Sequence, residues 1–264
     1  MFVSQMKKWA LIGLLLPLSS FAMSALEIVT KVDAVDDGDN ASSKMQMVLI
    51  DKKGNQRLRS MQRYSKDKGI DTLSSIYFLK PSDVKNTAFL TFDYKDSNKD
   101  DDQWLYLPAL KKSKRIASTD KSGSFMGSDF SYADMTDRNI EDYDYKILKE
   151  TKIKGGIAVW IIQSKPKTQK TVDEYGYKKS YMFVRKDNFM VAQAIHFLVD
   201  GKKKYMTVKK MEVIDGIWTA LEIEMKTKKG KQTTHATVLK ISDVTYNQNL
   251  DESFFSLRQI EKGL

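Results

Sequence analysis

Few side chains in this sequence have the types and spacing that catalysis needs. The chain contains two histidines, His196 and His235, and both fall in stretches with the alternation typical of strands. A Ser–His–Asp triad or a histidine-rich metal site needs serine, aspartate or further histidine motifs that neither residue has in its surroundings. We therefore interpret both histidines as residues that pack within strands.

An acidic run, DSNKDDD, begins like a calcium-binding loop. Asp96, Asn98 and Asp100 fit the first three ligand positions of such a loop. The glycine expected next is Asp101, and the terminal bidentate acid would fall on Leu107. The run is therefore interpreted as a solvated hairpin tip. The sequence predicts no metal site and no cofactor.

Two further patterns invite a chemical interpretation without supporting one. Glu222 and Glu224 share one face of a predicted strand, and paired carboxylates can do acid–base work, but an outward polar face is the favoured explanation. The stretch GSFMGS lacks the lysine of a phosphate-binding loop. Because no nucleophile motif is present, an envelope hydrolase is the least favoured function, and we predict no enzyme and no catalytic residue.

The most informative segment, residues 103–135, combines an aromatic strand, a proline, a basic run and a loop rich in Gly, Ser and aromatic residues. Ordinary core packing is one interpretation of each aromatic side chain. The alternative is a lining or lid over an apolar ligand, which Gly123, Gly127 and the serines favour because they add mobility. On this hypothesis the ligand-binding residues of the segment are Trp104, Tyr106, Phe125, Met126, Phe130 and Tyr132.

The elements that must position this segment are mostly strands. In the C-terminal half, apolar alternation recurs in residues 181–185, 189–199, 204–214, 217–226 and 233–244. The turns between these stretches include Asp200-Gly201, Asp215-Gly216 and Lys229-Gly230, and Asp-Gly between alternating runs is a strong hairpin signal. The sequence therefore predicts a long antiparallel meander in this half, preceded by further strands from residue 45 onwards.

Little of the chain is left to cover such a sheet. Leu26, Val29 and Val32 recur at helical spacing, and Gly38 can end a helix there. This helix and the loop at residues 123–135 are the available cover, which leaves room for an apolar cavity. In the strand 189–199, Ile195 and Phe197 are predicted to line it, although the pattern does not decide which face points inward. The predicted fold is mainly β (α+β): a curved antiparallel sheet forming an incomplete β-barrel, with a helix or loop lid.

The N-terminus resembles a secretory signal. Lys7 and Lys8 precede an apolar run and then SSFAMSA, and cleavage after Ala22 or after Ala25 fits the pattern. We therefore predict a signal peptide at residues 1–25 and one domain at residues 26–264, located in the periplasm of a Gram-negative bacterium. The chain has no cysteine and a formal charge of +10. Without cysteine it forms no disulfide and is no lipoprotein itself. The predicted compartment argues against nucleic acid as the basic chain's partner.

The sequence also resembles a known family. The stretch ALEIVTKVD, the segment DDDQWLYLPALKKSKRIASTDKSGSFMGSDFSYADM and the C-terminal meander are similar to the outer-membrane lipoprotein-sorting proteins, relatives of the periplasmic carrier LolA and its receptor LolB. The pattern WLYLP…K.KRI…SFMGSDFSY is typical of one branch, and the resemblance covers residues 26–264. This chain is longer and more basic than the standard carrier.

The resemblance implies a carrier that binds the acyl chains of lipoproteins or other lipids in an apolar cavity and transfers them towards the outer membrane. An inner-membrane exporter, an outer-membrane acceptor and transient membrane contact are the implied partners. Relatives in this branch accompany exporters of the resistance–nodulation–division type, so the cargo stays open between lipoprotein and another lipid. The alternative is a non-enzymatic adaptor that docks on such an exporter through its basic face.

Overall fold

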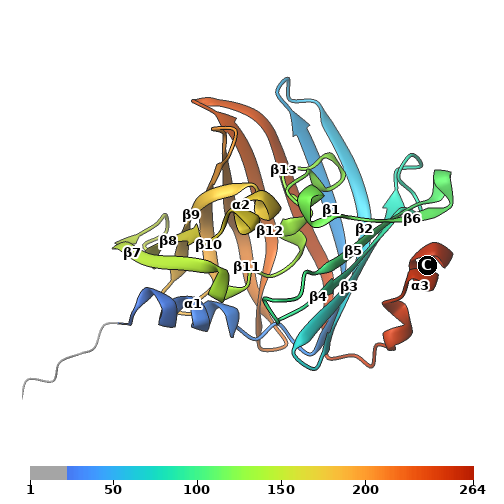
Figure 1. Cartoon of the computed structure of the whole chain (residues 1–264), viewed down its shortest axis with the longest axis horizontal. Helices are drawn as coiled ribbons and strands as arrows, with labels where there is room; N and C mark the ends of the chain where they lie inside the picture. The colour runs from blue at the N-terminus through green and yellow to red at the C-terminus, as the bar shows by residue number, and fades with distance from the viewer. Residues whose placement is uncertain (1–22) are drawn as a thin grey trace, which may run out of the picture.

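The computed structural model describes residues 23–264, so the predicted signal peptide, residues 1–25, lies almost wholly outside the described residues. The described chain forms one antiparallel sheet of thirteen strands in the order β6-β5-β4-β3-β2-β1-β13-β12-β11-β10-β9-β8-β7. The sheet is strongly curved (Figure 1) and stays open, with β6 and β7 as its edges. The strands are β1 (Asn40–Asp51), β2 (Gln56–Lys68), β3 (Asp71–Lys80), β4 (Ala88–Asp93), β5 (Asp102–Leu107), β6 (Lys112–Arg115), β7 (Tyr143–Lys152), β8 (Ala158–Pro166), β9 (Tyr177–Arg185), β10 (Val191–Leu198), β11 (Lys203–Ile214), β12 (Ile217–Lys229) and β13 (Gln232–Tyr246). The predicted incomplete barrel is confirmed.

Two meanders make up the sheet, and they meet in its middle. Strands β1 to β6 follow one another on one side, and β7 to β13 follow one another on the other. The first and last strands of the chain join them, with Met47 opposite Leu239 and Leu49 opposite Thr237. The predicted C-terminal meander is therefore confirmed, and it is longer than expected because β7 and β8 extend it.

Turn residues explain the register of the long hairpins. Between β11 and β12, Asp215 and Gly216 have φ of 51° and 87°, and positive φ at both central residues matches the right-handed twist of a hairpin. Between β1 and β2, Asp51 accepts hydrogen bonds from the backbone of Lys53 and Asn55 at 2.7 and 3.0 Å. Such local side-chain contacts set the pairing before any tertiary contact forms.

Within residues 23–264, three α-helices accompany the sheet: α1 (Ala25–Asp33), α2 (Gln169–Tyr175) and α3 (Leu257–Lys262). Helix α1, the predicted one, begins with a capping box. Ser24 accepts from the backbone N–H of Glu27, and the Glu27 carboxylate accepts from the backbone N–H of Ser24 at 2.6 Å. Helices α2 and α3 were not predicted, because six or seven residues are too few to show a helical period.

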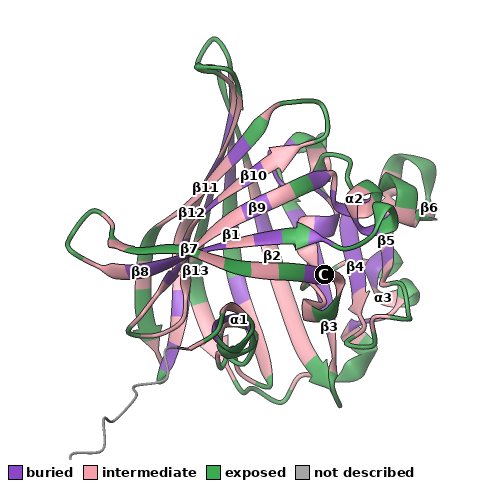
Figure 2. Ribbon diagram, turned by 60° about the vertical axis from the view of Figure 1, so that its left-hand side comes forward, coloured by how far each residue is buried: buried purple, intermediate pink, exposed green. Residues whose placement is uncertain are grey.

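The two faces of the sheet are covered differently. On the concave face, α1 places Ile28 and Val29 against β8 and β9, and the lid segment, which we define as residues 123–135, covers β1 to β5 together with β12 and β13. On the convex face, α3 places Ile260 against β3 and β4. Figure 2 shows the resulting alternation of buried and less buried residues along the strands, with exposed hairpin tips.

Candidate functional site

The lid segment is packed into the concave face as part of the core. It contains two short 3-10 turns, Phe125–Gly127 and Ala133–Met135. The ring of Phe125, which is 1% exposed, meets the ring of Phe89 at 5.1 Å and that of Tyr132 at 5.6 Å between centroids. Edge-on aromatic pairs of this kind add stability beyond the buried area. The packing fixes the lid on β4.

A buried carboxylate, Asp129, anchors the middle of the lid to β12 and β13. Asp129 accepts from the hydroxyl of Thr237 at 2.8 Å and lies 2.6 Å from Nδ1 of His235. Its other oxygen accepts from the Thr227 hydroxyl. The backbone N–H of Asp129 donates to Thr237 at 2.9 Å. A carboxylate satisfied by so many donors is held tightly, because moving it would leave those donors unpaired.

A second carboxylate, Asp134, anchors the end of the lid to β9 and β11. Asp134 accepts from the hydroxyl of Tyr177 at 2.8 Å, and the cations of Lys204 and Arg138 lie 3.7 and 3.6 Å away. Burial alone would raise the pKa of Asp134, but Lys204 and Arg138 outweigh burial and lower that pKa. The lid therefore ends in a charged cluster sealed beneath it.

His196 belongs to the same cluster on β10. Its Nδ1 lies 2.7 Å from the hydroxyl of Ser180, and its ring stacks on Tyr177 at 4.6 Å between centroids. Burial, reinforced by the charge of Arg138, lowers the pKa of His196 to about 3. His196 is thus a neutral packing residue, consistent with its interpretation from sequence.

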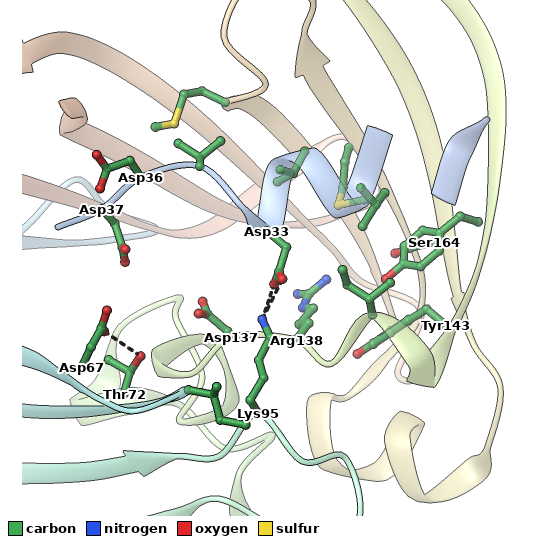
Figure 3. Close-up of a pocket in the computed structure, with 18 of the residues that line it drawn as sticks. Asp33, Asp36, Asp37, Asp67, Thr72, Lys95, Asp137, Arg138, Tyr143 and Ser164 are labelled. Carbon is green, nitrogen blue, oxygen red and sulfur yellow. Dashed lines mark hydrogen bonds and ion pairs between the residues drawn. The ribbon is translucent and has the colours of Figure 1, made fainter. Parts of the chain in front are cut away.

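A cavity of about 430 Å³ remains between α1, the segment just after the lid (residues 137–140) and the sheet. Figure 3 shows its interior, with Asp33 of α1 bonded to Lys95 and with Arg138 beside that pair. The Asp33–Lys95 pair measures 2.7 Å. The apolar part of the wall comes from the α1 region, the turn at residue 140, β9 with the turn that follows it, and β12: Val29, Val32, Val35, Ile140, Met182, Met190 and Trp218. The cavity is thus apolar on the side of α1 and the sheet and acidic along its margin.

The acidic margin consists of carboxylates at the mouth of the cavity. Asp37, Asp67 and Asp137 lie on three separate segments and are exposed. Partial burial, together with their mutual repulsion, raises the pKa of Asp37 and of Asp67. Burial also raises the pKa of Asp137. These carboxyl groups therefore keep their protons to a higher pH than ordinary aspartates do, and the mouth has an acidic lining although the chain as a whole is basic.

A second cavity of about 300 Å³ adjoins the first beneath the lid. Asp37 and Trp218 line both cavities, which lie side by side on the concave face and are together called the hollow. The second cavity lies over β1, β2, β3, β12 and β13, and its apolar wall comes from Ala41, Met45, Ile76, Met135, Ala220, Leu239, Ile241 and Val244. Together the cavities reach the size range of small-molecule sites.

The structure separates the eight residues that the sequence predicted for ligand binding. Four of them, Phe125, Met126, Phe130 and Tyr132, come together in the lid and its core cluster. Trp104 and Tyr106 point to the convex face, where they pack beside α3. Along β5 it is Gln103 and the two leucines that face the lid, and Gln103 donates to the carbonyl of Tyr132 at 2.9 Å.

The remaining two predicted residues lie on the outer face of β10. Phe197 meets Tyr181 at 4.9 Å between ring centroids, and the amines of Lys179 and Lys203 lie 4.7 and 4.9 Å from its ring. Ile195 has the same orientation, while Ala192, Ala194 and His196 point to the concave face. Within the described residues, none of the eight lines either of the two cavities.

Sequence reasoning missed the residues that do line the hollow. Trp218 and Arg63 sit on strands whose patterns looked outward-facing or polar. A β-bulge in β12 between Glu222 and Ala220 changes which residues face inward, and it brings Trp218 and Ala220 to the cavity. No local sequence pattern predicts such a bulge. In the described part of the chain, no group of His, Cys, Asp and Glu side chains could hold a metal ion, and no helix is long and apolar enough to cross a membrane.

Comparison with known proteins agrees with this architecture. The model of a protein family described only as uncharacterized matches residues 70–262. No curated protein matches the chain. A DUF1329 family protein from Desulfovibrio piger is 29% identical, with a TM-score of 0.81 over 89% of this chain and 97% of that chain.

Two further structures extend the comparison. A domain from Vibrio parahaemolyticus assigned to outer membrane lipoprotein sorting is 31% identical, with a TM-score of 0.81 over 90% of this chain and 98% of its own. A LolA superfamily protein from Nitrosomonas europaea shares the fold at 18% identity, with a TM-score of 0.68 over 90% and 99% of the two chains. The chain belongs to the family of this outer membrane lipoprotein-sorting domain and shares its fold with the LolA superfamily protein.

Proposed function

We propose that residues 26–264 form a single periplasmic carrier domain that binds the acyl chains of lipoproteins or other lipids and transfers them towards the outer membrane. The observation that supports this most is the hollow on the concave face, whose adjoining cavities of about 430 and 300 Å³ lie beside α1 and beneath the lid, respectively. The signal-like N-terminus and the family relationship support the compartment.

The hollow suits an acyl chain for energetic reasons. Each CH₂ group removed from water contributes about 0.8 kcal/mol, so a chain of roughly sixteen carbons carries on the order of 10 kcal/mol of hydrophobic free energy. Methionines at 45, 135, 182 and 190 line the walls. Met is flexible and adapts to irregular partners, which suits a site for mobile alkyl chains. In this proposal the protein does no covalent chemistry.

Helix α1 is the cover that moves in this proposal. The lid is held by Asp129 and Asp134, whose buried contacts make displacement costly. Helix α1 has nine residues, two of them buried, and rests on the sheet mainly through Ile28 and Val29. Short elements with few buried contacts open at low free energy. An exporter in the inner membrane and an acceptor in the outer membrane would then load and unload the hollow.

Binding of a fluorescent fatty acid tests the proposal. The mature protein is purified from periplasm, extracted for mass spectrometry of bound lipids, delipidated and titrated with the probe. Ala220→Trp places an indole in the second cavity and should weaken probe binding at least about tenfold by occupying the space. Trp104→Ala, on the convex face, is the matched control. If the wild type neither carries lipid nor takes up the probe, the carrier hypothesis is wrong.

A further inference from the structure

Arg63 is a cation inside the hollow with no hydrogen-bond or ion-pair partner in the part of the chain that the structure describes. It lies on the concave face of β2, opposite Ser43 on β1 and Ile76 on β3, and it lines the second cavity. Its guanidinium makes no hydrogen bond and no ion pair with any residue between 23 and 264. Burial lowers the pKa of Arg63. A desolvated guanidinium with unfilled donors is costly, which makes an acceptor-rich ligand its natural partner.

Three serine hydroxyls accompany Arg63 on the same patch of the sheet. Ser43 stands opposite Arg63, Ser65 is the next concave-facing residue along β2, and Ser74 stands opposite Ser65. All three line the second cavity. Within residues 23–264, none of their hydroxyls is engaged in a side-chain hydrogen bond. Facing side chains of paired strands lie about 5 Å apart, so the four groups offer donors to one small volume.

Most of the remaining wall of the second cavity is apolar, and the hydroxyls of Thr219 and Tyr246 in it bond to each other at 2.7 Å. Met45 and Ile76 flank the polar patch, and the residues of β12 and β13 that complete the wall are mostly aliphatic. Asp134, the acid of this cavity nearest the lid, is already engaged by Tyr177, Lys204 and Arg138. The cavity thus has one polar end rich in donors and one apolar end.

Two carboxylates offset part of the charge of Arg63. Asp37 and Asp137 both act on it electrostatically, yet neither comes within ion-pair distance. Neither carboxylate therefore occupies the hydrogen-bond donors of the guanidinium. Selectivity for an anion must therefore come from direct hydrogen bonds by the guanidinium and the hydroxyls, and these are short-range and charge-assisted.

On the basis of the proposed carrier function, we propose that Arg63, with Ser43, Ser65 and Ser74, binds the anionic head of an amphiphile whose chain fills the apolar end of the hollow. Carboxylate and phosphate heads share the required chemistry, since both are planar or tetrahedral arrays of oxygen acceptors that a guanidinium binds through two N–H groups. The cargo class is therefore a single-charged lipid rather than a neutral one.

Three amphiphiles with the same twelve-carbon chain test this site on the delipidated mature protein: dodecyl phosphate, dodecanoate and dodecanol, each titrated by calorimetry. The wild type should bind at least one of the anions at least about tenfold more tightly than the alcohol, as one charge-assisted contact provides. The ratio between the two anions distinguishes a phosphate head from a carboxylate head.

Variants separate this site from the carrier function as such. Arg63→Gln should remove the preference for anions and leave dodecanol binding within about threefold, because the apolar wall is intact. Ser65→Ala should reduce the preference in part. Arg57→Gln, at the exposed start of the same strand, should behave as wild type.

Two results overturn the inference in distinguishable ways. If the wild type binds none of the three amphiphiles, the carrier function and the head-group site both fail. If the alcohol binds as tightly as the anions, or if Arg63→Gln keeps the anion preference in a protein with an unchanged unfolding transition, the head-group site alone fails. Ser65→Ala adds a second measurement in case Arg63→Gln does not fold.

Discussion

Replacing His196 should change how the stability of this protein depends on pH. His196 is 5% exposed and sits in the cluster beneath the lid, bonded to Ser180 and stacked on Tyr177. Burial, with Arg138 as the second cause, lowers its pKa from 6.5 to about 3. In the unfolded chain the imidazole takes up a proton near pH 6.5, whereas the folded protein excludes that proton until about pH 3.

The direction and the magnitude of the pH effect on folding stability follow from this difference in pKa. Because the unfolded state binds more protons between pH 6.5 and 3, the contribution of His196 to folding stability is present above pH 6.5 and is lost as the pH falls. The loss is about 1.4 kcal/mol per pH unit within the window. Over the whole window it amounts to on the order of 5 kcal/mol, a large share of the stability of a typical domain.

Urea denaturation at pH 7, 6, 5 and 4 measures this effect for the wild type and for His196→Gln. Their difference in unfolding free energy should shrink on acidification by roughly 1 kcal/mol per unit, and other titrating groups cancel in the difference. Ser180→Ala removes the hydrogen-bond partner while the imidazole stays buried, so it should keep the wild-type slope. Parallel pH profiles for the wild type and His196→Gln would refute the reasoning.

Three further changes test other parts of the structure. Burial raises the pKa of Asp93 to about 8, so its contribution to stability is lost as the pH rises from 3.8 through 8; Asp93→Asn should gain stability relative to the wild type between pH 5 and 8, measured by thermal unfolding, and a constant difference would contradict this. Trp104→Ala should lower stability by up to about 3 kcal/mol but leave fatty-acid binding within about twofold, because Trp104 packs on the convex face. Of the two cleavage sites that fit the signal pattern, the structure favours the one after Ala22, three residues before the predicted end of the signal peptide at residue 25, because only that site keeps the capping residue Ser24; intact mass of the mature protein decides, and a start at Leu26 would contradict it.

The meander could be predicted because its information is local. Asp-Gly and Lys-Gly turns recur between alternating runs, and each sets a hairpin without reference to the rest of the chain. Helix α1 was predicted for the same reason, through Leu26, Val29 and Val32. The open barrel then followed from the small amount of chain left to cover so large a sheet.

The orientation of β10 could not be predicted, because both of its faces are apolar. Ile195 and Phe197 look more like core than Ala192 and Ala194 do, yet the structure turns the small residues inward, where the lid cluster and the cavity occupy the space. Lysine side chains over Phe197 make its outward position tolerable by covering the ring. Hydrophobicity alone therefore favours the outer face of β10, with Ile195 and Phe197, over the face that points inward.

The residues that hold the lid in place could not be predicted from the sequence for a different reason. Asp129 contacts Thr237 and His235, which lie more than a hundred residues away in the sequence. Arg63, which lines the second cavity, could not be predicted either. It lies in a strand with a mostly polar sequence, and only the curvature of the sheet places its side chain in the cavity wall. Long-range pairs of single polar residues leave no periodic pattern in one sequence.

The central pairing of the sheet has a consequence for the order in which the growing chain acquires its structure. Helix α1 is synthesised before the rest of the fold, but the strands on which it rests, β8 and β9, follow more than a hundred residues later. Strand β1 waits still longer, since Ala41 pairs with Tyr246 near the other end of the chain. Until β13 arrives, β1 presents an unpaired edge with Met45, Met47 and Leu49 uncovered. Such a chain closes late and slowly, and a holding chaperone would shield it during that interval.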